Sequence, residues 1–394
     1  MNKKLISLII VAILLLTSSN ALALGGESYD EVSFELGKSL NPPTKLNGLP
    51  YGSSFFEQLN SFERTVFYAR LENLDAFRNG VEDEIFFDVP ANTKAEDLAV
   101  AFFNACYAFD FDHPEIFWLS KTMRLGYYSN SSGTVSRAFF KKPDTGWYNT
   151  AYSSKNQIVN AEAAFNAKVN EIVSAAKGKD YDKVLYFHNW LVENNQYNRF
   201  VYEGNIDGAS QLAWSAASAL IGNSNDTKDD PVCEGYARAF KVLCDKAGII
   251  SALVSGSVGE LHMWNAVKMP NDLWFALDAT FDDPISQSPV LSHKYFLKGS
   301  KFMSRTHTEN GSITTYGTYA FPELCENDYP MNAGANLGDV NLDNKINTGD
   351  AVSILLYVVG EQNLIGEAKI CADFNCDTMI NTGDAVLILK YATN

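Results

Sequence analysis

Cysteine is scarce in this sequence, with 6 residues in a chain of 394. So few cysteines over such a length cannot build a disulfide scaffold, and no C-x-x-C pair indicates a zinc site. Positive charge is scarce too, because 31 Lys and Arg stand against 47 Asp and Glu, which gives a formal net charge of −16. A chain this acidic repels nucleic acid and anionic lipid, so we expect neither as a partner.

Long apolar runs are also missing, apart from a short one at the N-terminus. Lys3 and Lys4 precede the apolar run 5–16, and Ala21-Leu22-Ala23 follows it. This pattern predicts a secretory signal peptide, residues 1–23, with cleavage after Ala23. A membrane anchor is disfavoured, because the run is shorter than the roughly 20 residues of a spanning helix and no cysteine follows it for lipid attachment. We therefore expect a secreted, extracellular and soluble protein.

The length of 394 residues exceeds that of a single compact core and predicts about two to three domains. The N-terminal region, 24–154, is rich in aromatic residues, and helical spacing predicts a helix from Phe55 to Leu71. His113 precedes a proline and is interpreted as a packing or capping residue. Nothing in this region indicates chemistry, so its role stays open.

Two alanine-rich or apolar-periodic segments follow, and they predict helices over 156–176 and 181–194. His188 lies on the second helix among apolar neighbours, with no carboxylate at helical spacing, and is interpreted as structural. Further along, residues 311–336 are rich in Gly, Thr, Pro and Asn without a sustained period. They are expected to form a linker or a loosely packed edge.

A third predicted helix begins at Cys233, directly after the turn-rich stretch that ends at Pro231. Apolar residues recur at spacings of three and four until Gly248, which stands where a helix stops. The unpaired N–H groups and the positive dipole at a helix N-terminus stabilise a thiolate. Cys233 is therefore a candidate nucleophile, whereas Cys244 falls mid-helix on the apolar stripe and is assigned to the core.

A histidine and an aspartate lie on two strand-like runs that a Pro-Asn-Asp turn separates, 261–269 and 273–280. Folding this hairpin brings His262 opposite or diagonally opposite Asp278, within reach of a side-chain hydrogen bond. Asp282 and Asp283 compete for the carboxylate role, but their Asp-Asp-Pro setting favours capping or exit from the strand. The alternative is an unrelated buried cysteine and a core histidine. Three such residues on a helix start and two strands favour a site.

Cysteine catalysis needs these three residue types together. The thiol reacts as a thiolate, an imidazole takes its proton, and a carboxylate orients the imidazole. Cys233, His262 and Asp278 are the predicted nucleophile, general base and orienting residue. No cofactor is expected for this chemistry.

The three segments that carry these residues read CEGYA, HMWN and DATFDDP. They resemble the motifs of the transglutaminase-like, papain-related superfamily, and the resemblance spans roughly residues 155–305. It implies an α+β fold, with a Cys-bearing helix packed on an antiparallel sheet, in a catalytic core over 155–310. Members of the superfamily include peptidases, amidases, cross-linking enzymes and de-glycosylating enzymes. The zinc-binding cysteine pairs of the last group are absent here.

The C-terminal part contains an internal repeat, because the hexapeptide NTGDAV occurs at 347–352 and again at 381–386. Around it, oxygen-bearing residues follow the spacing of an EF-hand-type calcium loop, in which position 7 contributes a backbone carbonyl. The predicted ligands are Asp339, Asn341, Asp343, Lys345, Asn347 and Asp350 in the first copy, and Asp373, Asn375, Asp377, Met379, Asn381 and Asp384 in the second. We expect two bound Ca²⁺ ions, which a module this small needs in order to fold.

Each loop is followed by an apolar-periodic helix, expected over 351–359 and 385–391. Together the loops and helices resemble a type I dockerin over residues 337–394, a small all-α module. This resemblance implies a cohesin module of a cellulosome scaffoldin as partner, with two docking orientations. It places the contact region at Thr348-Gly349, Thr382-Gly383, Leu355-Leu356 and Leu389-Lys390.

Loop position 6, usually glycine, is Asn344 in the first copy and Thr378 in the second. Asparagine tolerates a positive φ, whereas a β-branched threonine does so poorly, so the second site is expected to be weaker. Cys371 and Cys376 flank the start of the second loop. Whether they pair stays open at this point.

The sequence as a whole predicts a secreted, cellulosome-attached cysteine enzyme at or near the cell surface that acts on amide bonds of proteins or peptides. Hydrolysis, and so a peptidase, is favoured because water greatly outnumbers amine acceptors outside the cell. Two alternatives stay open: a non-catalytic binding module with a vestigial triad, and a transamidase that cross-links proteins.

Overall fold

The computed structural model describes residues 28–35, 54–222, 227–285, 291–309, 319–330 and 336–393. The predicted signal peptide, 1–23, lies outside these residues. No helix in the described part of the chain is long and apolar enough to cross a membrane. The chain divides into two compact units. The first contains 59–110 and 119–150 with the N-terminal strand, and the second contains 54–58, 111–118 and the described residues from 151 onward.

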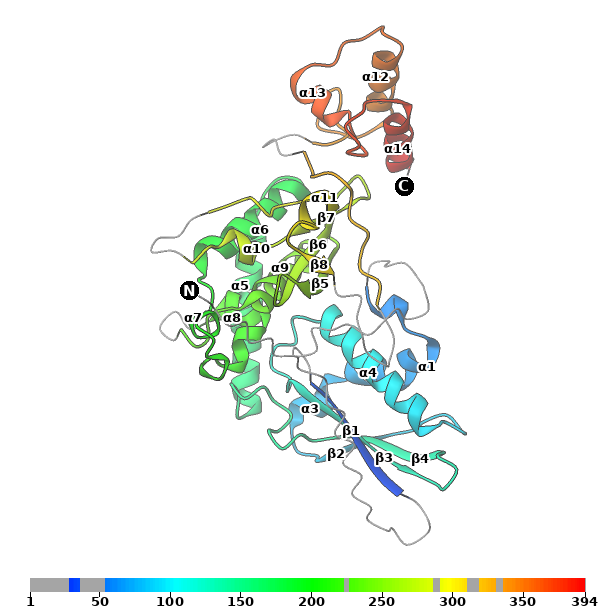
Figure 1. Cartoon of the computed structure of the whole chain (residues 1–394), viewed down its shortest axis with the longest axis vertical. Helices are drawn as coiled ribbons and strands as arrows, with labels where there is room; N and C mark the ends of the chain where they lie inside the picture. Colours follow the sequence, from blue (N-terminus) through cyan, green and yellow to red (C-terminus); the bar gives the residue numbers. More distant parts are fainter. Residues whose placement is uncertain are drawn as a thin grey trace, which may run out of the picture. The chain divides into compact units, whose positions relative to one another are not determined.

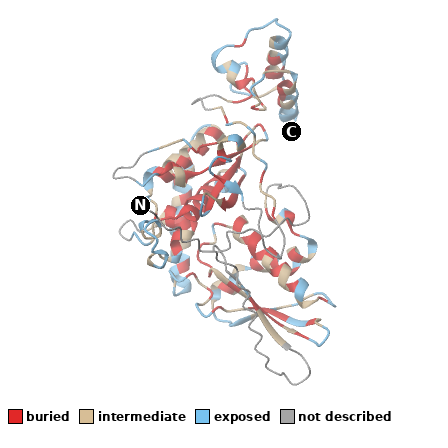
Figure 2. Ribbon diagram, viewed as in Figure 1, coloured by how far each residue is buried: buried red, intermediate tan, exposed pale blue. Residues whose placement is uncertain are grey.

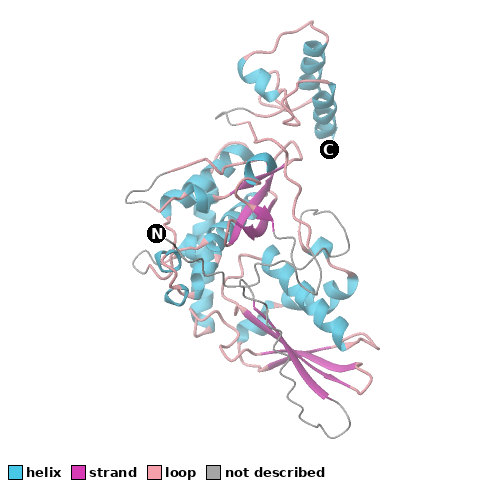
Figure 3. Cartoon of the chain, viewed as in Figure 1, coloured by secondary structure: helices cyan, strands magenta, loops and turns pink. Residues whose placement is uncertain are grey.

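The first unit is built on a four-stranded antiparallel sheet of order β1-β3-β4-β2 (Figure 3). Its strands are β1 (Ser28–Glu35), β2 (Glu84–Phe87), β3 (Thr122–Ser129) and β4 (Val135–Lys141). Aromatic side chains fill its core, with Phe67, Phe139 and Phe140 at most 1% exposed. The rings of Phe67 and Phe102 meet edge to face at 5.6 Å, an arrangement that adds to the area they bury.

The helical elements of this region are short, except for α4 (Ala95–Asp112). The single helix predicted from Phe55 to Leu71 is wrong: a 3-10 turn at Phe56–Gln58 is separate, and the helical run begins after Asn60. The Asn60 side chain accepts from the backbone of Glu63 and the Glu63 side chain accepts from Asn60. This capping box creates a helix start that apolar spacing cannot show. The run then continues as α1 (Ser61–Glu63), a π-helical turn (Arg64–Tyr68) and α2 (Ala69–Leu71), followed by α3 (Leu74–Asn79).

The second unit contains another four-stranded antiparallel sheet, of order β7-β6-β5-β8 (Figure 1). Its strands are β5 (Ser251–Ser257), β6 (Leu261–Lys268), β7 (Trp274–Leu277) and β8 (Thr308–Glu309). The helices of this part are α5 (Lys155–Ala175), α6 (Asp180–Asn194), α7 (Arg199–Tyr202), α8 (Ala216–Ile221), α9 (Cys233–Ala247), α10 (Ala279–Asp282) and α11 (Ser300–Met303). The ends of α5 and α6 agree with the predictions to within one residue.

Helix α9 is the centre of this core. It begins at Cys233 and ends at Ala247, and Gly248, with a φ of 75°, provides the left-handed cap predicted there. All residues from Cys233 to Cys244 are buried, as the red ribbon in Figure 2 shows. Asn265 of β6 donates a hydrogen bond to the Ala237 carbonyl at 2.9 Å and so fixes the helix against the sheet. The result is the mixed α/β architecture expected for the catalytic part.

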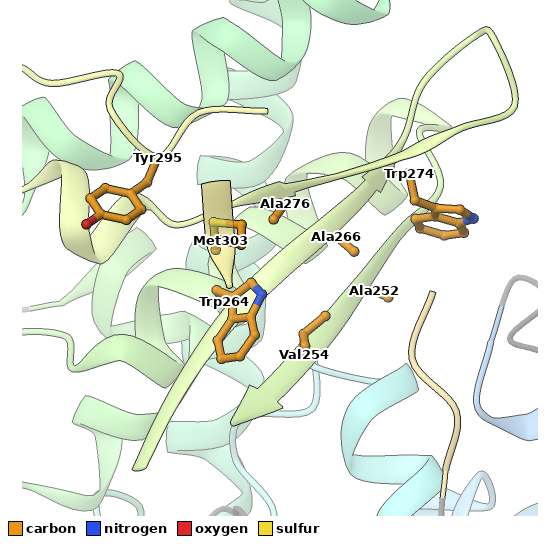
Figure 4. Packing of buried hydrophobic residues seen from close by; sticks show 8 residues of the cluster. All are labelled: Ala252, Val254, Trp264, Ala266, Trp274, Ala276, Tyr295 and Met303. Atoms are coloured by element: carbon orange, nitrogen blue, oxygen red, sulfur yellow. The ribbon is translucent and has the colours of Figure 1, made fainter. Parts of the chain in front are cut away.

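One face of the sheet carries an apolar cluster that supports β6 and β7 (Figure 4). Val254 pairs with Trp264, and Ala266 lies between Ala252 and Ala276 in register. Trp264 is 2% exposed, and Gly256 leaves room for its indole, because a Cβ there would collide with the ring. Removing such a buried indole costs roughly 3–5 kcal/mol of stability, so this cluster keeps the strands that carry the candidate site in place.

Part of the predicted linker, 311–336, packs on this core. Its described residues 319–330 include Leu324, which forms a parallel bridge with Trp274. Tyr329 is 4% exposed, its N–H donates to the Leu297 carbonyl at 3.0 Å, and its ring stacks with Tyr181. Residues 319–330 therefore extend the core, because their aromatic and apolar side chains outweigh the turn-forming composition of the surrounding stretch.

The C-terminal repeat forms three helices, α12 (Thr348–Val358), α13 (Gly366–Cys371) and α14 (Thr382–Thr393). Helices α12 and α14 pack against each other, with Ile354 and Ile388 fully buried. Both start three residues earlier than predicted. The side chain of Asn347 caps α12, and the Asp350 carboxylate accepts from the Asn347 backbone; Asn381 and Asp384 do the same for α14.

Candidate active site

Cys233 is the first residue of α9 and is 7% exposed. Val232 precedes it in an extended conformation and makes no side-chain cap. The N–H groups of the first helical turn have no partner within the helix and point toward its start, where they favour negative charge. The backbone places the thiol at the position that the sequence predicts.

His262 and Asp278 form a short hydrogen bond, in which Nε2 of the imidazole donates to Oδ2 of the carboxylate at 2.7 Å. Asn265 pairs with Leu277 in the register, so Asp278 reaches back to His262 diagonally, which is one of the two predicted arrangements. The predicted strand 273–280 is too long, because β7 ends at Leu277. Asp278 instead caps α10 and accepts the Phe281 N–H at 3.1 Å.

The imidazole of His262 also hydrogen-bonds to the Cys233 thiol. Since Nε2 is engaged with Asp278, Nδ1 is the nitrogen left for the sulfur. The structure thus brings together all three predicted residues in the order thiol, imidazole and carboxylate. This is the geometry that a cysteine nucleophile requires, with the carboxylate fixing which imidazole nitrogen faces the sulfur.

Charge in the site is arranged around a buried carboxylate. Burial lowers the pKa of His262, but the Asp278 charge and hydrogen bond, together with Cys233, outweigh it and raise that pKa to about 10. Burial raises the pKa of Asp278, but His262 and then His307 lower it well below its usual range. The pair therefore consists of an imidazolium and a carboxylate at neutral pH. The Cys233 side chain thus has an imidazolium as its neighbour.

His307 is a member of the site that the sequence did not reveal. Its Nε2 donates to the same Asp278 oxygen at 3.0 Å, and its Nδ1 lies 2.8 Å from the Thr306 hydroxyl. Its side chain is 1% exposed. His307 lies 29 residues from Asp278, just before β8, and no local motif marks it; only the pairing of β8 with β5 brings it to the site.

Tyr197 is a second residue that sequence reasoning missed. Its hydroxyl accepts the backbone N–H of Cys233. Burial, followed by the negative charges of Cys233 and Glu260, raises the pKa of Tyr197. The hydroxyl therefore keeps its own proton and can donate it to an oxygen that gains charge next to the sulfur.

Aromatic rings enclose the imidazole of His262. Trp264 stacks on it at 6.1 Å between ring centres, and the Phe281 ring lies at 4.9 Å. His307 in turn meets Trp264 and Phe281, each at 5.0 Å. These rings exclude water, and in such surroundings the attraction between imidazolium and carboxylate is stronger than at the surface.

The two rival carboxylates bind other partners. Asp282 is paired with His188, whose Nε2 lies 3.1 Å from its Oδ2, and both side chains are completely buried. The hydroxyl of Tyr236 donates to Asp283. Both lie beyond the end of β7, as predicted, and Asp283 is the C-cap of α10. The carboxylate partner that His188 lacks at helical spacing comes from α10, 94 residues further along the chain.

His262, Asp278 and His307 also form the one group of three such side chains, in the described residues, whose potential metal ligand atoms lie within 4.8 Å of each other. Two histidines and a carboxylate are a possible ligand set for a divalent metal. Here, however, both imidazoles already meet the same carboxylate oxygen at hydrogen-bond distances of 2.7 and 3.0 Å. The arrangement fits a shared carboxylate better than a coordination sphere.

The residues predicted as calcium ligands form hydrogen bonds within their own loops. In the first copy, Asp339 accepts the N–H of Asp343 at 3.0 Å and of Asn344 at 2.8 Å. Asp350 closes the loop from the other end and accepts the Val340 N–H at 2.7 Å. The remaining members, Asn341, Lys345 and Asn347, lie on the same turn: Asn341 accepts from Asp343, Lys345 donates to Asp343, and Asn347 donates to Asp350.

The second loop repeats this pattern. Asp373 accepts from Asp377 and Thr378, Met379 donates to Asp377, and Asp384 accepts from Asn375 and Asn381. Burial, and the charges of neighbouring carboxylates, raise the pKa of Asp373 and of Asp384. Position 6 has the positive φ expected in both copies, 67° at Asn344 and 75° at Thr378.

One family of known proteins matches part of this chain. Residues 167–279, which contain Cys233, His262 and Asp278, match the family described as the transglutaminase-like superfamily. The second unit therefore contains a transglutaminase-like core. Comparison with curated proteins gives no match.

Two solved structures are similar at low identity. One, described as "Crystal structure of a TGase", is 13% identical with a TM-score of 0.28, over 66% of this chain and 63% of that one. A candidate cysteine protease from Cytophaga hutchinsonii is 11% identical with a TM-score of 0.23, over 64% of this chain and 75% of that one. This chain thus covers less than two thirds of the first structure's length.

Proposed function

We propose that the transglutaminase-like core, residues 155–310, is a cysteine enzyme that attacks amide bonds through Cys233, His262 and Asp278. The observation that carries this proposal is the continuous hydrogen-bonded chain from the thiol through the imidazole to the buried carboxylate. The buried His188 has a carboxylate on one nitrogen and an amide side chain on the other. His262 has a carboxylate on one nitrogen and a thiol on the other.

The reaction begins when the Cys233 sulfur, its proton held by His262, adds to the amide carbonyl carbon. The carbonyl oxygen gains negative charge, which the Tyr197 hydroxyl and the first N–H groups of α9 can stabilise. His262 then gives its proton to the departing amine, and an acyl-thioester remains on the sulfur. Asp278 keeps the imidazole oriented in both steps.

Water or a second amine then releases the acyl group from Cys233. With water the enzyme is a peptidase or amidase, and with an amine it is a cross-linking transamidase. We favour water, because the proposed extracellular location supplies it in great excess over amines. In that step His262 removes a proton from the water and the thiol leaves.

The test uses the mature chain and its Cys233→Ala variant, incubated with a mixed peptide library and a tagged primary amine. We expect new peptide termini in the unmodified protein alone, detected by mass spectrometry. Tagged or deamidated glutamines would assign transamidation instead. The matched control is Cys244→Ala, which removes a buried thiol from the same helix and should leave product formation intact.

Absence of any product that depends on Cys233 would contradict the proposal and favour a binding module with an inactive triad.

We propose in addition that residues 337–394 are a calcium-dependent dockerin. The support is the crowding of carboxylates in each loop: the pKa of Asp373 and of Asp384 is raised by burial and by other carboxylates nearby. A bound cation would offset this repulsion. The Asn and backbone oxygens at alternate loop positions complete the set of hard ligands that Ca²⁺ prefers.

Calcium binding is tested on the full chain by calorimetric titration. We expect two ions per chain, with Asp350→Asn and Asp384→Asn each weakening one site, and the second site weaker because Thr378 carries a strained φ of 75°. Binding of a type I cohesin should disappear in excess chelator. Retained cohesin binding without calcium would refute the dockerin assignment.

With a signal peptide and a dockerin, the enzyme would be secreted and attached to a cellulosome scaffoldin at or near the cell surface. Fractionation of the producing cells tests this location. We expect the protein in the cellulosome fraction, and a version truncated before residue 337 free in the medium.

A further inference from the structure

Two cysteines that are far apart in the sequence meet within the second unit. Cys325 belongs to the segment 319–330 that packs on the core, and Cys376 belongs to the second loop of the repeat. Their side chains are neighbours, and the Asn271 amide donates to the Cys376 sulfur at 3.6 Å. The Cys325 sulfur also lies 4.0 Å from the carbonyl oxygen of Asn375, the residue that precedes Cys376. Contact between two sulfurs is the geometric precondition for a disulfide.

The backbone of Cys325 is held by the core on both sides. Its N–H donates to the Trp274 carbonyl at 2.8 Å, and its carbonyl accepts the Ser300 N–H at 2.8 Å. The chain around Cys376 is held as well. Asn327 donates to the Cys376 carbonyl at 2.9 Å, and Asn271 donates to the Phe374 carbonyl at 3.0 Å. The two sulfurs are therefore kept together by contacts that do not involve the thiols.

The internal repeat shows that this contact is particular to the second copy. Leu342 and Cys376 occupy the same loop position, and both have a left-handed backbone, with φ of 59° and 56°. Leu342 is 46% exposed, whereas Cys376 is only 3% exposed. The same backbone thus presents an exposed side chain in one copy and a sulfur turned toward Cys325 in the other.

We propose that Cys325 and Cys376 form a reversible disulfide that fastens the C-terminal repeat to the transglutaminase-like core. The oxidant is a small-molecule disulfide. The Cys325 thiolate, which is partly exposed, attacks it and releases one small thiol. Cys376 then loses its proton and displaces the second small thiol from the mixed disulfide. The two protein thiols are oxidised, and one small disulfide is reduced to two thiols.

This link has a structural consequence that does not depend on the proposed function. With free thiols, the repeat is held on the core by non-covalent contacts such as the hydrogen bonds from Asn271 and Asn327. With the disulfide, it is covalently fixed through residue 376. The redox state of this pair would then decide how freely the repeat moves relative to the core.

The experiment uses the full chain with Cys233→Ala, which removes the reactive thiol of the site. The protein is exposed to oxidised glutathione, blocked with an alkylating reagent, and digested without reduction. Lys345 and Lys369 lie between the two cysteines, so trypsin separates them. We expect the thiol count in denaturant to fall from five to three, and a cross-linked peptide pair that separates on reduction.

The neighbouring Cys371 must be distinguished from Cys376, because trypsin leaves both in one peptide. A protease that cuts before Asp373 separates them without any further substitution. The cross-link should follow Cys376, persist in Cys371→Ser and vanish in Cys325→Ser. An unchanged thiol count, or a cross-link that follows Cys371, would overturn the proposal.

Discussion

Two of the buried histidine–aspartate pairs in the described part of the second unit, His262–Asp278 and His188–Asp282, look alike but differ in the group at the second imidazole nitrogen. His262 meets Asp278 at 2.7 Å, and His188 meets Asp282 at 3.1 Å. The first imidazole reaches the Cys233 thiol with its other nitrogen. The second reaches the side chain of Asn189 at 3.1 Å, which in turn lies 2.7 Å from His293. A histidine–aspartate pair is therefore no evidence of catalysis by itself, since what the second nitrogen touches decides the chemistry.

The largest difference between the two pairs should appear in the rate of the Cys233-dependent reaction. The substitution His262→Asn removes the group that takes the thiol proton. It should lower Cys233-dependent turnover by about 10³-fold or more. The matched substitution His188→Asn should leave the rate of the folded enzyme within about threefold. Initial rates on a peptide substrate found in the library screen measure both, at a temperature where circular dichroism shows both variants folded. Equal losses would refute the distinction.

Of the two carboxylates, Asp282 should matter more for stability, whereas Asp278 should matter more for turnover. Asp282 accepts from His188, the Ser292 hydroxyl and the Tyr295 N–H in a fully buried setting. Breaking such a pair by Asp282→Ala should reduce the free energy of unfolding by roughly 3–5 kcal/mol, measured by urea denaturation. Asp278→Asn keeps the side-chain volume and should mainly reduce turnover. If Asp282→Ala unfolds the chain, Asp282→Asn gives the smaller, measurable loss.

The dependence of folding stability on pH tests the shifted pKa values of the His262–Asp278 pair. The pKa of His262 is raised to about 10 from an ordinary 6.5, so its stabilising contribution is complete below about pH 6.5 and is lost as pH rises through 10. The pKa of Asp278 is lowered, so its contribution is present above its ordinary 3.8 and is lost only as pH falls below that value. The stability advantage of the unmodified protein over His262→Asn should shrink between pH 6.5 and 10, by at most about 1.4 kcal/mol per pH unit. A constant difference over this range would contradict the assigned shift.

Tyr197→Phe tests the hydroxyl that lies at the Cys233 backbone N–H. The variant removes one donor to the developing oxyanion, so we expect kcat to fall about 10- to 100-fold with little change in KM. The matched control is Tyr186→Phe, on α6. A change in KM alone would mean that Tyr197 binds substrate and does not stabilise the transition state.

The smallest effect is expected from His307, which touches the Asp278 carboxylate and not the sulfur. His307→Gln should lower turnover only about threefold to tenfold, because His262 still donates to Asp278. It should also raise the pKa of His262, because the Asp278 charge is then shared with one imidazole fewer. An NMR titration of the His262 ring reports this shift, which a purely structural role for His307 would not produce.

The local sequence was enough to predict the elements of the site. Pro231, the spacing of apolar residues and Gly248 predict α9 with Cys233 at its start, and the Pro-Asn-Asp turn predicts the hairpin of β6 and β7. The turn also predicts that Asp278 lies opposite or diagonally opposite His262, and the strand register selects the diagonal arrangement. Loop positions 6 of the repeat have the positive φ that their spacing predicts.

Other features of the fold could not be predicted from the local sequence. The capping boxes at Asn60 and Asn347 shift helix starts through side-chain hydrogen bonds, which apolar periodicity does not detect. Residues 319–330 have the composition of a linker yet pack on the core.

By itself, the sequence predicted Cys233, His262 and Asp278 as candidate site residues, with the helix start and the hairpin that position them, because helix starts and turns are encoded over a few residues. Only the tertiary structure decided their partners: Asp278 for His262, Asp282 for His188, His307 as the second donor to Asp278, and Cys325 for Cys376. These contacts join residues up to 94 positions apart. They arise from burial of the apolar faces on which those residues lie, and not from any signal in their own neighbourhood.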